Sequence, residues 1–275
     1  MKKLHLLLLA LLVSAVTVSL SSASLPEAKK NAPAVTQGAG VPILLYHRFG
    51  PTVADGMTIK TTVFESHLKY LKDNGYKVIP LRQLIDWYQK KGPAPAPKSV
   101  VIVADDGHKS VYSDMLPLAK KYNVPVTLFI YPSAISNAKY AMTWDQLREL
   151  KKTGLFDLQS HTFWHPNFKH DKKKMTQAEY EKSVDVQLKK SKERLEKQLG
   201  GKVDMLAWPY GIFDDYLLQK AASAGYVTTF TILGHHAGAG DTLMKLPRYL
   251  LINSDQGKIF AQILAGGAPN RNLAF

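Results

Sequence analysis

Two pairs of polar residues have the types and spacing of a metal-dependent hydrolytic site. His161 and His165 are four residues apart, a spacing that stacks two imidazoles on one face of a helical turn and is typical of zinc sites. Two imidazoles leave a metal ion short of ligands, and the adjacent carboxylates of Asp105 and Asp106 can supply another. Successive side chains at a strand end point in different directions, so one carboxylate can bind metal while the other acts as a base.

Each pair also has a simpler explanation when it is taken alone. A histidine pair can be a surface accident, and Asp105-Asp106-Gly107 is typical of a turn. The combination is more informative, because both pairs directly follow apolar runs that predict strands, residues 100–103 and 156–159. Two further clusters occupy equivalent positions: Tyr46-His47-Arg48 and Pro209-Tyr210-Gly211.

The elements that must position these clusters form a repeated strand and helix pattern. Short apolar runs alternate with amphipathic stretches over residues 41–264, which gives seven or eight units. Strands joined by helical crossovers form a parallel sheet, and this number of strands favours a distorted (β/α)7–8 barrel. Active sites of such barrels lie at the carboxyl ends of the strands, where all four clusters are expected. The longest predicted helix, residues 176–199, begins with a capping box of Thr176 and Glu179.

The composition restricts how a metal could be held. The 275 residues include no cysteine, which excludes disulfides, thiolate metal sites and a cysteine nucleophile. Any metal must therefore be bound by His, Asp or Glu side chains. A set of two histidines and one carboxylate favours zinc, although cobalt, nickel and iron accept the same ligands.

The N-terminus predicts export. A positive start, an apolar run over residues 4–20 and the small residues Ser21-Ser22-Ala23 indicate a signal peptide over residues 1–23. The alternative is an uncleaved membrane anchor, because the apolar run approaches the ~18 residues that can span a bilayer. Residues 24–40 predict a flexible linker and residues 41–275 a catalytic domain. The expected location is periplasmic or extracellular.

The charge is strongly positive, with 36 Lys and Arg against 22 Asp and Glu, a formal net charge of +14. Removing Lys2 and Lys3 with the signal leaves 14 − 2 = +12. An exported protein meets anionic envelope polymers and lipid headgroups, so we expect association with that envelope and no nucleic-acid partner. A solvated basic face is the simpler alternative, since the lysines lie in helical runs without interleaved aromatics. The chain is expected to be a monomer.

The clusters resemble the first three motifs of the NodB-homology polysaccharide deacetylases, carbohydrate esterase family 4. The matching runs, in the order of the family, are Ala104-Asp105-Asp106-Gly107, His161-Thr162-Phe163-Trp164-His165 and Trp208-Pro209-Tyr210-Gly211. The resemblance spans residues 41–252 and implies a distorted barrel with a divalent metal, usually zinc. By the same resemblance the metal ligands are Asp106, His161 and His165, and the catalytic base is Asp105.

The resemblance implies removal of acetyl groups from an N-acetylhexosamine polysaccharide. Metal coordination lowers the pKa of water toward about 7, so a carboxylate such as Asp105 can deprotonate it for attack on the acetamide carbonyl. The metal and, by family analogy, the backbone N–H of Tyr210 would stabilise the oxyanion. A protonated group must also reach the leaving amine.

The sequence departs from the family pattern at two functional positions. Many members carry an arginine two residues before the proline of the third motif, where it orients the base, and this chain has Ala207. Arg248 is a candidate replacement, and a surface arginine beside a turn is the alternative. No Leu-x-His motif near the C-terminus supplies the acid. His236, in a glycine-rich loop, is the candidate for the general acid. The alternatives are that His236 is merely an exposed loop residue, or that Asp105 moves the proton alone.

Several side chains near the motifs suit contact with a sugar polymer. Flat apolar faces of Trp164, Trp208 and Tyr210 can stack on a pyranose ring. Arg248 and His108 complete the predicted substrate-binding residues. His47 is expected to line the cleft, with a buried, hydrogen-bonded role as the alternative.

The predicted function is metal-dependent N-deacetylation of an N-acetylhexosamine polysaccharide outside the cytoplasm, with resemblance to the poly-N-acetylglucosamine branch of the family. The missing arginine and the unassigned acid leave a non-catalytic carbohydrate-binding barrel open. A metal-dependent amidase of a small amide is a third hypothesis, because related barrels host that reaction.

Overall fold

The computed structural model describes residues 40–267. The predicted signal peptide, residues 1–23, and all of the predicted linker except Gly40 lie outside the described residues, as does the end of the predicted catalytic domain from residue 268. Within residues 40–267, no helix combines the length and the apolar character needed to cross a bilayer.

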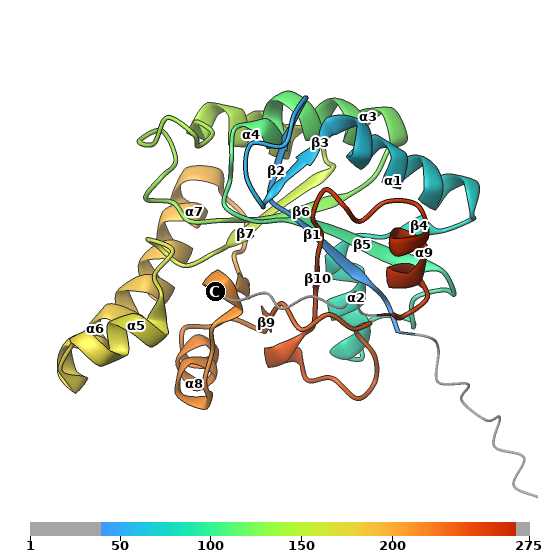
Figure 1. The fold of residues 1–275 in the computed structure, drawn as a ribbon. Helices are drawn as coiled ribbons and strands as arrows, with labels where there is room; N and C mark the ends of the chain where they lie inside the picture. Colours follow the sequence, from blue (N-terminus) through green and yellow to red (C-terminus); the bar gives the residue numbers. More distant parts are fainter. Residues whose placement is uncertain (1–39, 268–275) are drawn as a thin grey trace, which may run out of the picture. The chain divides into compact units, whose positions relative to one another are not determined.

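Parallel strands form one sheet that curves into a barrel (Figure 1). The order in the sheet is β10 (Tyr249–Leu250), β1 (Ile43–Tyr46), β5 (Ser99–Ala104), β6 (Val126–Ile130), β7 (Phe156–Ser160), β8 (Met205–Ala207) and β9 (Thr228–Phe230), with β4 (Lys77–Val78) beside β5. Phe230 of β9 forms a parallel bridge with Leu246, just before β10, so the two edges of the sheet nearly meet. The predicted distorted (β/α)7–8 barrel is confirmed.

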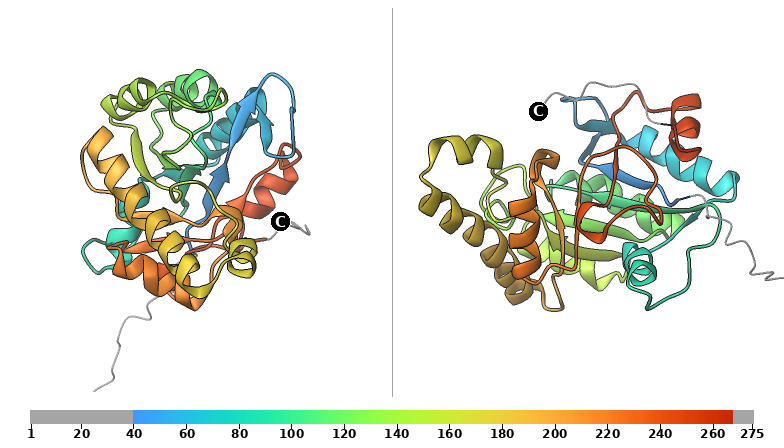
Figure 2. Two further views of the ribbon diagram at one scale, coloured as in Figure 1. Left: turned by 90° about the vertical axis from the view of Figure 1, so that its left-hand side faces the viewer. Right: turned by 90° about the horizontal axis from the view of Figure 1, so that it is seen from below.

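Helices cover the outside of the strands. In Figure 1 the helices α1, α3 and α4 lie along the upper side of the sheet, and in Figure 2 the α5–α6 pair extends away from the strands. The bounds are α1 (Thr61–Asp73), α2 (Leu81–Tyr88), α3 (Leu116–Tyr122), α4 (Trp144–Lys152), α5 (Phe168–Lys174), α6 (Gln177–Asp185), α7 (Ser191–Leu199), α8 (Asp215–Ser223) and α9 (Lys258–Leu264). A short parallel pair, β2 (Arg48–Gly50) and β3 (Thr58–Lys60), was not predicted.

The long predicted helix contains an irregular centre. Its capping box is confirmed, because the Thr176 hydroxyl accepts the N–H of Glu179 and the Glu179 carboxylate accepts the N–H of Thr176. Between α6 and α7 the segment η2 (Val186–Lys190) is π-helical. A π-helical turn takes up more residues than an α-turn and so changes which side chains face the barrel, and such turns are frequent at functional sites.

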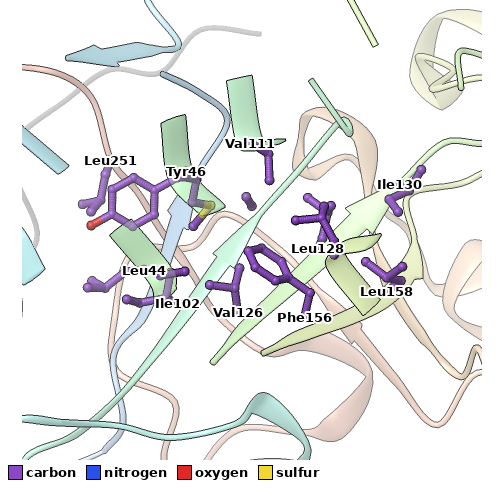
Figure 3. Close-up of a cluster of buried hydrophobic side chains, with 14 of the residues drawn as sticks. Leu44, Tyr46, Ile102, Val111, Val126, Leu128, Ile130, Phe156, Leu158 and Leu251 are labelled. Atoms are coloured by element: carbon purple, nitrogen blue, oxygen red, sulfur yellow. The ribbon is translucent and has the colours of Figure 1, made fainter. Parts of the chain in front are cut away.

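Alternate residues of the strands enter two apolar layers. One layer, which includes Leu44, Ile102 and Leu128, packs between the strands and the outer helices (Figure 3). The other layer contains the intervening strand residues, such as Leu45 and Val103, and fills the barrel interior. Two buried layers explain why the strands read as continuous apolar runs rather than as an alternating pattern.

Candidate active site

The strand alternation carries four side chains into the mouth of the barrel. Residues two positions apart along an extended chain point the same way. A polar residue that comes two positions after an interior strand residue therefore also points into the barrel. The four side chains are His47 after β1, Asp105 after β5, Tyr131 after β6 and His161 after β7, and all line one pocket of about 360 Å³. The pocket therefore lies at the carboxyl ends of the strands, as the barrel predicts.

Asp106 reaches the same pocket through an unusual backbone turn. By strand alternation its side chain would point away from Asp105, but the chain turns through left-handed conformations at Asp106 (φ 76°) and Gly107 (φ 79°). As a result both carboxylates line the pocket, and both are buried. A left-handed non-glycine residue is uncommon, and such residues cluster at functional sites.

Asp106, His161 and His165 converge as a metal-binding set. Their candidate ligand atoms all lie within 4.8 Å of one another. Oδ1 of Asp106 lies 3.6 Å from Nε2 of His161 and 3.5 Å from Nε2 of His165, which is too long for a hydrogen bond. It is close to the roughly 3.4 Å that separates two ligands of a tetrahedral zinc ion bound at about 2.1 Å. Oδ1 of Asp106 is also buried without a hydrogen-bond partner among the described residues, so the set fits a divalent cation.

The hydrogen bonding of His161 fixes the tautomer that a metal ligand needs. Its Nδ1 lies 2.8 Å from the carbonyl oxygen of Ala207, which can only accept, so Nδ1 carries the proton. The Nε2 lone pair is therefore directed toward Asp106. Metal-binding histidines usually donate their other ring N–H to such a partner.

The loop between the two histidines is not the helical turn that their spacing predicted. Residues 161–167 contain no helix, and α5 begins only at Phe168. The loop instead takes left-handed conformations at Thr162 (φ 64°) and His165 (φ 59°), and the two imidazole centres lie 4.8 Å apart. The histidines meet through this loop geometry rather than through a helix face.

Arg248 pairs with Asp105 beneath the pocket. Its Nη1 donates to Oδ1 of Asp105 at 2.8 Å, and its Nε donates to the carbonyl oxygen of Thr231 at 2.9 Å. The guanidinium also lies over the rings of Phe129 and Phe230, and the side chain is 0 % exposed. This geometry excludes the alternative of a surface arginine. The side chain nevertheless lines the pocket beside Asp105, so a substrate-binding role for Arg248 stays a prediction.

The charges around the pocket determine its protonation. Burial works against ionisation of Asp105, but the charge of Arg248 is the largest of the effects that oppose it, and the pKa of Asp105 lies below its ordinary value. Burial lowers the pKa of His47, and burial together with His161 lowers the pKa of His165 to about 4. Asp105 is therefore an anion near neutral pH, while His47 and His165 are uncharged.

Tyr210 lies at the pocket wall in a turn that requires glycine. Its backbone is left-handed (φ 56°), and its ring meets the edge of the His165 ring with centres 4.7 Å apart. The next residue, Gly211, has a φ of 66°, and a Cβ there would lie 2.5 Å from Cγ1 of Ile232. Only glycine fits this position, which explains the Pro-Tyr-Gly run in physical terms.

His236, the predicted acid, lies away from the pocket. Its Nε2 donates to the carbonyl oxygen of Ile263 in α9 at 3.0 Å. The next residue, Ala237, pairs with Val41 just before β1 begins, which is the amino end of the strands. The prediction of His236 as a catalytic residue was wrong, because the loop after β9 folds back along the barrel.

The predicted sugar contacts are distributed differently from the expectation. Trp208 is among the residues that line the pocket, but it is 0 % exposed and packs edge-on against Phe168, so its ring offers no free face for stacking. Trp164 is 54 % exposed but is not among the residues that line the pocket. His108 is also outside the pocket lining, with its Nδ1 2.8 Å from the Ser110 hydroxyl.

Residues that sequence reasoning missed complete the pocket. Tyr131 and Tyr140 share a hydrogen bond of 2.6 Å between their hydroxyls, and the Tyr131 ring lies 5.2 Å from the His165 ring. Tyr131 directly follows β6, so the strand-end rule that selected Asp105 could have found it. Met57, just before β3, also lines the pocket and had no signal in the sequence, whereas Arg48 of β2 belongs to the predicted Tyr46-His47-Arg48 cluster.

A family model described as polysaccharide deacetylase matches residues 92–229. The poly-β-1,6-N-acetyl-D-glucosamine N-deacetylase of Staphylococcus aureus (strain MRSA252) is 29% identical over 199 residues, covering 70% of this chain and 68% of that protein. The enzyme of the same name from Escherichia coli (strain K12) is 25% identical over 259 residues, covering 81% of this chain but only 38% of its own length.

Solved structures share the fold. The Streptococcus pyogenes deacetylase PplD in complex with acetate superimposes with a TM-score of 0.73 at 24% identity, covering 82% of this chain and 99% of that one. IcaB from Ammonifex degensii gives a TM-score of 0.72 at 23% identity, covering 83% and 97%. At these identities the two likenesses establish the barrel fold.

Proposed function

Since the chain belongs to the polysaccharide deacetylase family, we propose that it hydrolyses the N-acetyl groups of a poly-β-1,6-linked N-acetylglucosamine polymer, in a metal-dependent reaction outside the cytoplasm. The polymer is the substrate in the printed names of the relatives from Staphylococcus aureus and Escherichia coli. The observation that carries the proposal is the convergence of a metal-binding set with an arginine-paired carboxylate in one pocket.

The metal would be held by Asp106, His161 and His165, with zinc favoured by the ligand types. Such an ion, when bound, supplies a Lewis acid that polarises the acetamide carbonyl and acidifies water. His165 lines the pocket beside the exposed Tyr210, so this side of the set is the one that faces the substrate.

Asp105 is proposed as the general base. It is anionic near neutral pH and lies beside the metal-binding set, with Oδ2 3.8 Å from Nε2 of His161. Arg248 holds the other carboxylate oxygen, so one oxygen is fixed and the other is directed toward the pocket. Arg248 is thus proposed to orient the base in place of the third-motif arginine, whose position is occupied by Ala207 in this chain.

The remaining steps need a donor to the oxyanion and a proton for the leaving amine. The backbone N–H of Tyr210 is proposed as the oxyanion donor. For the acid, His47 replaces His236 in the proposal: it lines the pocket, and its Nδ1 is buried without a partner among the residues described. Because His47 is uncharged, it would first receive the proton that Asp105 removes from water, and it would then pass this proton to the amine as the carbon–nitrogen bond breaks.

Exposed aromatic side chains in and beside the pocket suit a polymer. Trp164, Tyr210 and Tyr140 present exposed aromatic side chains on the loops of the pocket region, and aromatic faces stack on sugar rings. We keep Trp164 and Tyr210 as proposed sugar contacts and withdraw Trp208.

The cellular setting belongs to the same proposal. Residues 1–23 would direct export, residues 24–40 would act as a linker, and residues 41–275 would form the catalytic domain. The positive charge would favour a location beside anionic envelope polymers, and the working unit would be a monomer.

Acetate release from N-acetylglucosamine oligomers by zinc-loaded protein tests the function. Asp105→Asn should lower the rate by about 10²–10⁴-fold, the usual contribution of a general base, while leaving zinc affinity in place. Asp145→Asn, which changes an exposed carboxylate on α4, is the control and should be fully active. Wild-type activity in Asp105→Asn would refute the role of Asp105 as the base. Activity that persists in the presence of a chelator would refute the dependence of the reaction on a metal ion.

A further inference from the structure

The loop that joins the two proposed metal-binding imidazoles has a backbone that its own sequence disfavours. Thr162 and His165 both take positive φ values, 64° and 59°, although neither is glycine. For a residue branched at Cβ such as Thr162 this is a genuine outlier. Strained conformations persist only where the surrounding structure fixes them. Something outside the loop must therefore hold it.

A single side chain holds the centre of this loop. Oε1 of Gln187 accepts the backbone N–H of Phe163 at 3.0 Å and the backbone N–H of Trp164 at 2.8 Å. Both amides lie between His161 and His165 in the chain. Gln187 is 1 % exposed, so water is a poor substitute for its oxygen.

The π-helical segment between α6 and α7 supplies this side chain. Gln187 belongs to η2, and Ser191 follows one turn later at the start of α7. The Ser191 hydroxyl bonds to that of Ser160 at 2.8 Å, and the Ser160 oxygen accepts the N–H of Thr162. Three consecutive backbone amides between the histidines are thus held, two directly by Gln187 and one by Ser160 of β7, which Ser191 contacts in turn.

We propose that Gln187 is a positioning residue of the metal site: it fixes the 161–165 loop so that both imidazoles face Asp106. The inference rests on the proposed metal-dependent function. Gln187 itself belongs neither to the metal-binding set nor to the residues that line the pocket. Its effect on the metal is therefore indirect, through two backbone hydrogen bonds.

Zinc affinity of the purified protein, measured by competition with a chromogenic chelator, tests the proposal without relying on activity. Gln187→Met keeps the side-chain length but removes the acceptor, and should weaken zinc binding about 10–100-fold, as loss of a supporting partner does elsewhere. Gln187→Glu keeps an oxygen for both amides and should restore affinity to within a few-fold of wild type.

Gln159 provides a matched control. It is also a buried glutamine, 0 % exposed, and its Oε1 accepts two consecutive backbone amides, those of Asp204 and Met205, at 3.0 Å each. Those amides lie at the start of β8, away from the histidine loop. Gln159→Met should lower the melting temperature as Gln187→Met does, yet bind zinc like wild type.

The outcomes separate the two proposals. Wild-type affinity in Gln187→Met, or an equal loss in Gln159→Met, would overturn the positioning role and leave the metal site standing. A wild-type chain that binds no zinc would overturn the proposed metal-dependent function and this role with it. If Gln187→Met does not fold, Gln187→Asn, whose shorter side chain moves the acceptor back, should show the same weakened binding; wild-type affinity there would overturn the role.

Discussion

At the scale of residues, the Asp105–Arg248 pair determines what the pocket can do. Both side chains are buried and are joined by a charge-assisted hydrogen bond of 2.8 Å. A buried charge is tolerated when it is paired, and removing one partner leaves the other charge uncompensated. The pair therefore couples the position of the proposed base to the stability of the barrel.

Arg248→Met should destabilise the protein by about 3–5 kcal/mol and abolish measurable acetate release, because Asp105 is left as an unpaired buried carboxylate. The double variant Asp105→Asn, Arg248→Met should lose less stability than the sum of the two single variants, by about 1–3 kcal/mol. Urea unfolding of the four proteins measures this coupling.

Arg82→Met is the control for that experiment. Arg82 also forms a double hydrogen bond with an aspartate, Asp204, but is partly exposed and lies outside the pocket. Arg82→Met should lower the free energy of unfolding by less than Arg248→Met does, and it should leave acetate release per folded molecule unchanged. Additive losses in the Asp105–Arg248 cycle would show that the two side chains do not interact energetically.

At the scale of elements, His67 joins three parts of the barrel wall. Its Nε2 donates to the carbonyl oxygen of Asp255 at 2.6 Å, so its Nδ1 accepts the Tyr46 hydroxyl at 3.1 Å. The ring also stacks on Phe260, with centres 4.0 Å apart. His67 thus links α1 to β1 and to α9, and this contact requires the neutral imidazole.

Burial lowers the pKa of His67 to about 4, which predicts an acid-sensitive fold. The unfolded chain takes up this proton below about pH 6.5 but the folded chain only below about 4, so stability is full above pH 6.5 and falls between those values. Between pH 6.5 and pH 4 the free energy of unfolding should fall by about 3 kcal/mol more for the wild type than for His67→Gln, which lacks the titrating ring.

Chemical denaturation of both proteins in the presence of chelator, at steps from pH 7 to pH 4, measures this difference. The chelator removes any contribution from metal binding, and the other buried histidines contribute equally to both proteins. Parallel stability curves for wild type and His67→Gln would refute the role given to His67.

At the scale of the whole molecule, the metal would connect strands that are distant in sequence. Asp106 follows β5 and the two histidines follow β7, so a bound ion would bridge two strand ends across the mouth of the barrel. A ligand that binds only the folded state stabilises it by mass action. Metal binding and barrel stability are therefore predicted to be linked.

Zinc at a hundredfold excess over its Kd should raise the free energy of unfolding by about 2.7 kcal/mol, which is about 5–10 °C in Tm for a domain of this size. Chelator should reverse the shift. His161→Gln lacks one proposed ligand and should show no response to zinc at the same concentration, as measured by a thermal scan. A zinc response in His161→Gln equal to that of wild type would place the ion elsewhere.

The sequence by itself determined the barrel and the inward direction of much of the site. Continuous apolar strands buried on two sides require a parallel sheet covered by helices. Because strand side chains alternate, the positions of Asp105 and His161 two residues beyond interior strand residues already direct both into the mouth. These properties are local, so they can be inferred from short stretches of chain.

Only the tertiary structure decided the contacts between distant segments. Arg248 reaches Asp105 across 143 positions of sequence, whereas His236, equally plausible in the sequence, is turned toward α9. Gln187 and the left-handed turns at Asp106 and Thr162 gave no sequence signal, because backbone strain is set by the partners that fix it. Spacing thus identified the groups that could do chemistry, and packing determined which of them meet.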